Sequence, residues 1–345
     1  IFSTFLFPYY NTDIDIAINQ LYNFQIKESI NTLNEMSKEY SEDPVIPFLK
    51  ISAQWQYSLL YDSPESSYNI INDGINRLVP FYVDMIEKYP NEQKYNLFLG
   101  SLYGLKARIS LAKSEWMNLV ISGTRGFKYI SDSIENNPSL YDAYMPIGTL
   151  EYFLCRSSST LQMIGGMFGL KSDCQEAIEK LELASNRAEY SWIEARNVLS
   201  YIYLYIERDY AKAYSNAHSL THSFPGHPFF LYLEAESLIK LKEYDKFNEI
   251  ENKLVQFYKE GPPYQKNECY DKYLYLNALK SFQNKNYDLA IKFSSEIINS
   301  YNIEFEWVLG YSHLIRGKSF ELTGNRPIAI SDYKKAIKYL DNYPD

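Results

Sequence analysis

Three of the four histidines lie close together in the sequence, and their spacing is the first pattern that could support chemistry. His218 and His222 are one helical turn apart, which would let two imidazoles reach one metal ion. No acidic ligand lies between them, the HExxH arrangement is absent, and His227 follows a Pro-Gly turn. We therefore interpret all three as ordinary surface histidines, and we expect no metal and no other cofactor.

A glycine-containing stretch interrupts the helical pattern at 156–172 and superficially resembles a phosphate-binding loop that ends in a lysine. Such a loop needs a glycine directly before its lysine, so that backbone amides can surround the phosphate, and it must follow a strand. Leu170 occupies that position and helices flank the segment, which argues against nucleotide binding. We interpret 156–172 as an insertion that packs Met163, Met167 and Phe168 across the inner face. The alternative is an adaptable partner-binding lip.

No other pattern predicts catalysis. Glu and Asp are scattered along helix surfaces, so the carboxylate pair of a glycosidase cannot be identified. No GxSxG or SxxK motif is present, and no cysteine has a histidine partner in the pattern. We predict that the protein is not an enzyme.

The three cysteines, Cys155, Cys174 and Cys269, are an odd number without CxxC or zinc-type spacing. We interpret them as buried thiols, with a pairing of Cys155 and Cys174 as the alternative.

Composition limits the class of protein further. The chain has 345 residues, of which 46% are hydrophobic and 17% aromatic, so it can bury a large core. It has only 14 glycines and 14 prolines, which indicates long and regular packed elements. The formal net charge of -9 argues against nucleic acid, or an anionic membrane surface, as a general partner. No run of 18 apolar residues predicts a transmembrane helix.

The N-terminal residues 1–10 begin with an apolar run that resembles the end of a secretory signal, although no small-x-small cleavage site follows. The alternative is a short apolar segment that covers the first repeat. We favour export, to the periplasm of a bacterium or beyond, over a cytoplasmic location.

Internal repetition is the strongest signal of architecture. In the stretch 310–345, small and aromatic residues recur at spacings of 3, 9, 4 and 3, at Gly317, Phe320, Ala329, Tyr333 and Ala336. Small residues let two helices approach closely, and the aromatic side chain fills the space beside them. The pattern therefore describes a helix, a turn and a second helix.

The same spacing recurs from Tyr201 and from Ala278, and less completely from Ala235 and Ala17. These residues resemble the pattern of the tetratricopeptide repeat family, specifically over 190–345, moderately over 12–40 and only in architecture over 45–187. The order of segments is similar to that of exported bacterial tetratricopeptide proteins. The residues that carry this likeness are Tyr22-Asn23-Phe24, Gly100 with Gly104, Gly123 with Gly126, and Asn137-Pro138-x-x-Tyr141-Asp142-Ala143.

The resemblance implies an all-α fold, an α-solenoid of about eight antiparallel helix pairs wound as a right-handed superhelix. We expect one domain over 11–345, interrupted by the insertion at 156–172. Proline and polar stops divide the chain into pairs near 12–40, 45–89, 92–136, 139–187, 190–223, 227–260, 265–300 and 304–342. Pro80 is expected to kink or break the second helix of the second pair.

The predicted function is a non-enzymatic scaffold that binds a peptide or partner protein on a concave face lined by the first helix of each pair. The family binds its ligands through polar and aromatic groups on first helices, which makes six residues the expected contacts: Arg196, Asn197, Tyr201, Tyr232, Lys272 and Asn277. Tyr201, Tyr203 and Tyr205 alternate, so we place them on different sides of a helix.

The alternative function is a surface or periplasmic glycan-binding protein that resembles the SusD-like group, suggested by the aromatic content. An aromatic cluster beside a carboxylate on an exposed concave surface would favour it, whereas a groove of mixed polar side chains would favour the scaffold. An α/α-toroid enzyme is disfavoured by the repeat spacing and the missing acid pair.

Overall fold

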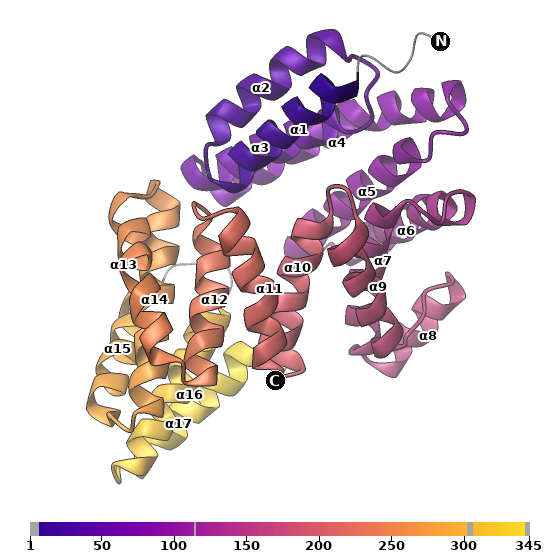
Figure 1. Cartoon of the computed structure of the whole chain (residues 1–345). Coiled ribbons are helices and arrows are strands. Elements are labelled where there is room, and N and C mark those ends of the chain that lie inside the picture. Colours follow the sequence, from indigo (N-terminus) through magenta and orange to yellow (C-terminus); the bar gives the residue numbers. More distant parts are fainter. Residues whose placement is uncertain (1–6, 114, 302–305, 342–345) are drawn as a thin grey trace. The chain divides into compact units, whose positions relative to one another are not determined.

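A computed structural model describes residues 7–113, 115–301 and 306–341 of the chain (Figure 1). These residues form seventeen α-helices, one 3-10 turn and one π-helical turn, and they contain no strand, which confirms the all-α class. The predicted N-terminal signal at 1–10 lies mostly outside the described residues, which begin at position 7 with the first helix. No described helix has the length and apolar character needed to cross a membrane.

The contacts divide the chain into two compact units, Ile1–Leu199 and Ser200–Asp345. The helices that begin in unit 1 are α1 (Phe7–Tyr22), α2 (Ile26–Glu39), α3 (Ile46–Tyr61), α4 (Pro64–Lys88), α5 (Lys94–Ala112), α6 (Trp116–Asn136), η1 (Tyr141–Ala143), α7 (Tyr144–Cys155), α8 (Ser159–Met167), α9 (Cys174–Arg187) and α10 (Trp192–Tyr201). Those of unit 2 are η2 (Ile202–Ile206), α11 (Tyr210–Ser223), α12 (Pro228–Leu241), α13 (Tyr244–Glu260), α14 (Pro263–Gln283), α15 (Tyr287–Ser300), α16 (Trp307–Leu322) and α17 (Arg326–Leu340).

Seven of the eight predicted ranges contain two helices that pack against each other, with α8 as an extra helix between α7 and α9. In the range 190–223, the element that packs on α11 is the π-helical turn η2, which follows α10. In unit 2 the first helices also contact one another in sequence, because α12 packs on α14 and α14 on α16. The continuous superhelix expected over 11–345 stays a prediction.

Unit 2 is held together by one apolar core. Fully buried side chains from the second helices, such as Phe247 of α13 and Ala290 of α15, pack against those of the first helices, such as Ala235 and Ala278. The small residues at repeat positions allow this close approach, as their spacing predicts. The core thereby fixes how α12, α14 and α16 lie beside one another.

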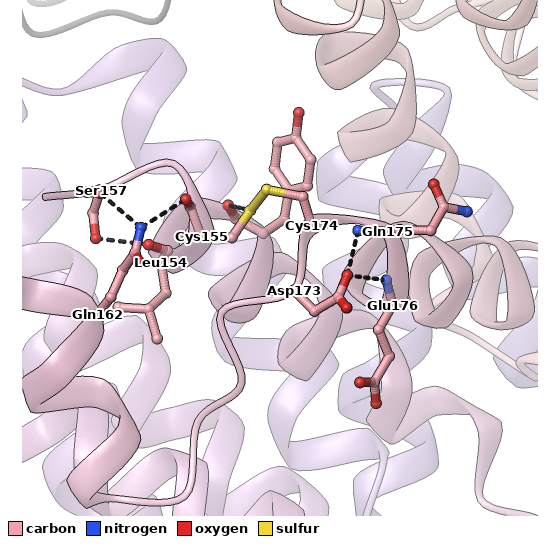
Figure 2. The surroundings of a disulfide bond; sticks show 9 residues. Leu154, Cys155, Ser157, Gln162, Asp173, Cys174, Gln175 and Glu176 are labelled. Carbon is pink, nitrogen blue, oxygen red and sulfur yellow. Dashed lines mark hydrogen bonds between the residues drawn. A yellow bond between two sulfur atoms is a disulfide. The ribbon is translucent and has the colours of Figure 1, made fainter. Parts of the chain in front are cut away.

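Two sequence expectations in unit 1 need comment. Helix α4 continues through Pro80, so the predicted break is absent, whereas the kink stays a prediction. Pro80 is exposed, so water can satisfy the backbone carbonyl that the proline leaves without a donor. Cys155 and Cys174 are not free thiols but form a disulfide bond (Figure 2), whereas Cys269 is a buried thiol as predicted.

The insertion at 156–172 also differs from expectation. It folds into the short helix α8, and Met163, Met167 and Phe168 are 65%, 78% and 48% exposed rather than packed on an inner face. The side of α8 that meets α7 is occupied instead by Gly165, because a Cβ there would lie 2.5 Å from a methyl carbon of Leu154.

Helices α5 and α6 approach closely at two glycines that the sequence marks, Gly100 and Gly126. A Cβ placed on Gly100 would lie 2.5 Å from Cγ1 of Ile130 and 2.8 Å from the carbonyl oxygen of Gly126. A Cβ on Gly104, one turn along the same helix, would meet nothing within 4 Å. The two glycines of α5 therefore have different roles.

We predict that Gly100→Ala lowers the free energy of unfolding of unit 1 by about 1 to 3 kcal/mol, because the added methyl forces the two helices apart. The control Gly104→Ala is expected to raise it by about 0.5 to 1 kcal/mol through helix propensity. Urea unfolding of the full chain, followed by hydrogen exchange of peptides from α5 and α6, measures both. Equal effects of the two substitutions would contradict the close packing at Gly100.

Candidate functional site

A recess in unit 2 gathers aromatic and charged side chains from the first helices of four successive predicted pairs. Its empty space is about 280 Å³, the solvent-facing part included. Six aromatic residues, two leucines and two charged residues line it: Tyr201, Tyr205, Phe229, Tyr232, Leu233, Glu236, Lys272, Tyr275, Leu276 and Trp307. They come from α10 and η2, from α12, from α14 and from α16.

The carboxylate of Glu236 is buried in the lining of the recess, with only 2% of the residue exposed. The hydroxyl of Tyr205 donates to one of its oxygens at 2.6 Å, and the hydroxyl of Tyr275 donates to the other at 2.7 Å. Burial raises the pKa of Glu236, although both hydroxyls and two nearby lysines oppose the shift. One tyrosine comes from η2 and the other from α14, so the carboxylate of α12 joins three helices.

Lys272 on α14 contributes a buried ammonium group to the same recess. The Nζ atom lies 4.2 Å from the ring centre of Phe229 and 5.9 Å from that of Trp307, within the range of cation–π attraction. It also donates to Oε1 of Glu268 at 2.7 Å. Burial alone would lower the pKa of Lys272, but Glu268 and the neighbouring hydroxyl of Tyr201 outweigh it, and the pKa is raised.

His227 lies at the start of α12 and is buried, which corrects its interpretation as a surface residue. Its ring stacks on Phe230 with centres 3.6 Å apart, and Nδ1 accepts the backbone N–H of Phe230 at 3.3 Å, which caps the helix. Burial and the positive charge of Lys272 lower the pKa of His227 to about 3. The imidazole is therefore neutral at ordinary pH.

Three of the six predicted contact residues, Tyr201, Tyr232 and Lys272, line the recess. Tyr201 is 36% exposed, whereas Tyr232 is buried and donates its hydroxyl to the carbonyl of Cys269. Asn277, on the same helix as Lys272, lies outside the lining, and its amide donates to the carbonyl of Tyr273 at 3.0 Å.

The other two predicted residues, Arg196 and Asn197, belong to unit 1. The Nε of Arg196 donates to the carbonyl of Ser185 at 3.3 Å, and burial lowers its pKa. The amide of Asn197 donates to Glu194 at 3.3 Å. Both side chains are thus engaged within their own unit.

Sequence reasoning did not single out Glu236, Phe229 or Trp307 as contacts, yet helical periodicity indicates one of them. Glu236 is four residues after Tyr232, so both lie on the same side of α12. The same rule applies to Tyr205, four residues after Tyr201, with ring centres 5.8 Å apart.

The prediction that Tyr201, Tyr203 and Tyr205 lie on different sides of a helix holds for Tyr203 but not for Tyr201 and Tyr205. Tyr201 and Tyr205 lie together in the recess. Tyr203 contacts Lys212 instead, whose Nζ lies 4.9 Å from its ring centre.

Across the described residues, no group of three or more histidine, cysteine or acidic side chains is arranged to hold a metal ion. His218 is largely exposed, and its Nδ1 lies 2.7 Å from a carboxylate oxygen of Glu234. No family model matches the chain, and no curated protein matches it in sequence.

We predict that acid destabilises unit 2 through His227. Its folded-state pKa is about 3 and its ordinary value is 6.5, so the unfolded chain takes up a proton first as the pH falls. The contribution of His227 to the free energy of unfolding is fully present above pH 6.5. It is lost as the pH falls toward 3, at up to about 1.4 kcal/mol per pH unit. His227→Asn, whose amide oxygen can replace Nδ1 as the capping acceptor, is expected to reduce this loss.

Urea unfolding between pH 4 and pH 7, read by hydrogen exchange in α12, provides the measurement. His222→Asn, the same substitution at an exposed histidine of α11, serves as the control and is expected to follow the wild type. A wild type and a His227→Asn variant with the same pH dependence would show that the histidine is not held neutral.

Proposed function

We propose that the chain is a tetratricopeptide-like scaffold without catalytic activity, and that unit 2 binds an extended segment of a partner protein across its first helices. One side chain of the partner enters the recess. The observation that carries this proposal is the origin of the lining, since every residue of the recess comes from a first helix. First helices are the ligand-binding elements of the family that the repeat spacing resembles.

The chemistry of the recess supports binding. Its empty space includes open solvent, so the enclosed part is far smaller than a small-molecule pocket, which suits contact with part of one side chain better than a cofactor. Both oxygens of Glu236 already accept tyrosine hydroxyls, so the carboxylate is committed to holding the helices. Aromatic walls favour a partner group with an apolar body, since the ammonium of Lys272 is already engaged by Glu268 and the ring of Phe229.

A glycan ligand is the second candidate, favoured by the specific observation that six aromatic residues surround a carboxylate. Sugar rings stack on open aromatic faces. Tyr232 and Tyr275 are only 5% and 2% exposed. Tyr201, which is 36% exposed, is the most accessible tyrosine of the lining. This distribution fits one inserted side chain better than a sugar platform.

The disulfide between Cys155 and Cys174 supports the proposal that the protein is exported. Disulfide bonds persist in oxidising compartments such as the bacterial periplasm and are rare in reducing cytosol. We therefore propose that the protein functions in the periplasm or at the cell surface.

We predict that Tyr201→Ala weakens binding to peptides selected from a displayed random library against the wild-type chain by about tenfold or more, since it removes one wall of the recess. Tyr264→Ala is the matched control, because this tyrosine of α14 is 47% exposed and lies outside the recess. Fluorescence anisotropy of the selected peptides measures both affinities.

Selected peptides that bind Tyr201→Ala and the wild type equally would contradict the proposed site. A failure to select peptides, together with binding on a glycan array that Tyr201→Ala abolishes, would replace the scaffold by the glycan-binding alternative.

A further inference from the structure

Helix α17, yellow in Figure 1, exposes two isoleucines beside its contact with α16. Ile330 and Ile337 lie two turns apart on one side of the helix and are 46% and 68% exposed. The side that packs on α16 is buried at Ala329, Ala336 and Leu340. Outer surfaces of repeat arrays are ordinarily polar, so the exposed apolar side of α17 marks a candidate contact surface.

The repeat spacing identifies the same side on two earlier second helices. Helices α11, α15 and α17 each contain a buried alanine at the equivalent repeat position, and these alanines are Ala213, Ala290 and Ala329. The residues one, five and eight positions after the alanine follow the i, i+4, i+7 spacing of one helix side. On α17 these three residues are Ile330, Lys334 and Ile337.

On the earlier helices this side receives the first helix of the next pair. The middle residue of α11 is His218, whose Nδ1 lies 2.7 Å from a carboxylate oxygen of Glu234 on α12. The middle residue of α15 is Ser295, whose hydroxyl accepts a hydrogen bond from Nη1 of Arg316 on α16 at 3.1 Å. Glu234 and Arg316 are themselves equivalent, since each directly precedes the small residue that marks its first helix. The same pair of positions therefore joins α11 to α12 and α15 to α16.

On α17 the corresponding side is open. The flanking residues of α11 and α15 are buried or half-buried, namely Tyr214, Thr221, Ile291 and Ile298. Their counterparts Ile330 and Ile337 are exposed, and Lys334 makes no hydrogen bond or ion pair within the described part of the chain. Helix α17 thus has the contact surface of a second helix without a first helix packed on it.

The open side is also basic. The single acidic residue of α17, Asp332, is buried against α16, where His313 and Arg316 bind it. Glu321 of α16 borders the open side and accepts the hydroxyl of Tyr333 at 2.5 Å. The exposed charges of α17 are all positive: Arg326, Lys334, Lys335 and Lys338. In a chain with a formal net charge of -9, this local excess of positive charge favours an acidic partner.

We propose that α17 binds an acidic amphipathic helix of a partner protein, which packs on it as α12 packs on α11. Apolar side chains of that helix cover Ile330 and Ile337. A carboxylate faces Lys334, as Glu234 faces His218. The occupant is a helix because the corresponding side of α11 and of α15 receives a helix.

The basic charge argues against a second copy of the chain on this surface. A symmetric dimer places the same residues opposite one another, so Lys334 and Lys338 would approach their own counterparts. An unsymmetric contact between copies would build a ring or a filament. A partner of different sequence and opposite charge avoids both. This inference does not depend on the proposed function of the recess, whose lining contains no residue of α17.

The probes are two fluorescent amphipathic peptides of about 20 residues with leucines at i, i+3, i+4 and i+7, one with glutamates and the other with lysines on the remaining positions. We expect the full-length chain to bind the acidic peptide in fluorescence anisotropy, and to bind it more weakly as the salt concentration rises. Lys334→Glu with Ile337→Ser is expected to weaken this binding by about tenfold or more, without weakening binding of the basic peptide. Both side chains are exposed, so the variant should fold, which circular dichroism verifies.

Leu289→Ser with Lys292→Glu is the matched control, because it makes similar changes at two exposed positions of α15. It is expected to bind the acidic peptide like the wild type. Absence of acidic-peptide binding, or an equal loss in both variants, would overturn the proposal.

Two further measurements on the same variants can also overturn it. Binding to phosphatidylglycerol vesicles that Lys334→Glu with Ile337→Ser abolishes, without peptide binding, would assign this side of α17 to a membrane surface. Self-association that the same variant abolishes, measured by sedimentation velocity, would assign it to a second copy.

Discussion

The arrangement of unit 2 depends on one buried carboxylate. Glu236 of α12 lies in a nearly solvent-free position and receives the hydroxyl of Tyr205 from η2 on one oxygen and that of Tyr275 from α14 on the other. A buried carboxyl group without hydrogen-bond partners is strongly unfavourable, so both tyrosine hydroxyls must stay within hydrogen-bond distance of Glu236. The requirement fixes the rotation of three helices relative to one another, and it places the rings that line the recess.

The positions of the other charged groups follow from the same arrangement. The rings of Tyr205 and Tyr275 each lie within 6 Å of the ring of Trp307, which brings α16 into the cluster. Lys272, one turn before Tyr275, reaches the ring of Phe229 and the carboxylate of Glu268. Its charge in turn helps to keep the imidazole of His227 neutral. Apolar packing brings the helices together, and these polar contacts set their register.

Much of the fold was predictable because its signals are local. Small residues at fixed spacing, with proline and polar stops, predict helices close to the observed ones. Of the four glycines in α5 and α6 that carry the family likeness, only Gly100 and Gly126 lie at the close contact, and the sequence does not distinguish them from Gly104 and Gly123. The predictions that failed depend on the surroundings of a residue. Pro80 is tolerated because it faces solvent, and whether two cysteines pair depends on the course of the intervening chain.

The candidate site was predictable in the same limited way. Tyr201, Tyr232 and Lys272 were identified from their helices, and helical periodicity extends the set to Tyr205 and Glu236. Trp307 and Phe229 reach the recess through packing between helices, and no local sequence pattern predicts that packing. The prediction that Met163 and Met167 of α8 pack on an inner face fails for a related reason. Apolar character alone predicts burial and does not indicate which face of a helix points to solvent.

The most direct test of the central claim is a double-mutant cycle on the two tyrosines that hold Glu236. Tyr205→Phe and Tyr275→Phe remove one hydroxyl each and keep both rings, and equilibrium unfolding in urea gives the free energies. The account predicts that each substitution costs about 1.5 to 3 kcal/mol, as expected for a hydrogen bond to a charged group. The double variant should lose at least about 0.5 kcal/mol more than the sum, because the second change leaves the carboxyl without a donor. Single variants as stable as the wild type, or strictly additive losses, would contradict it.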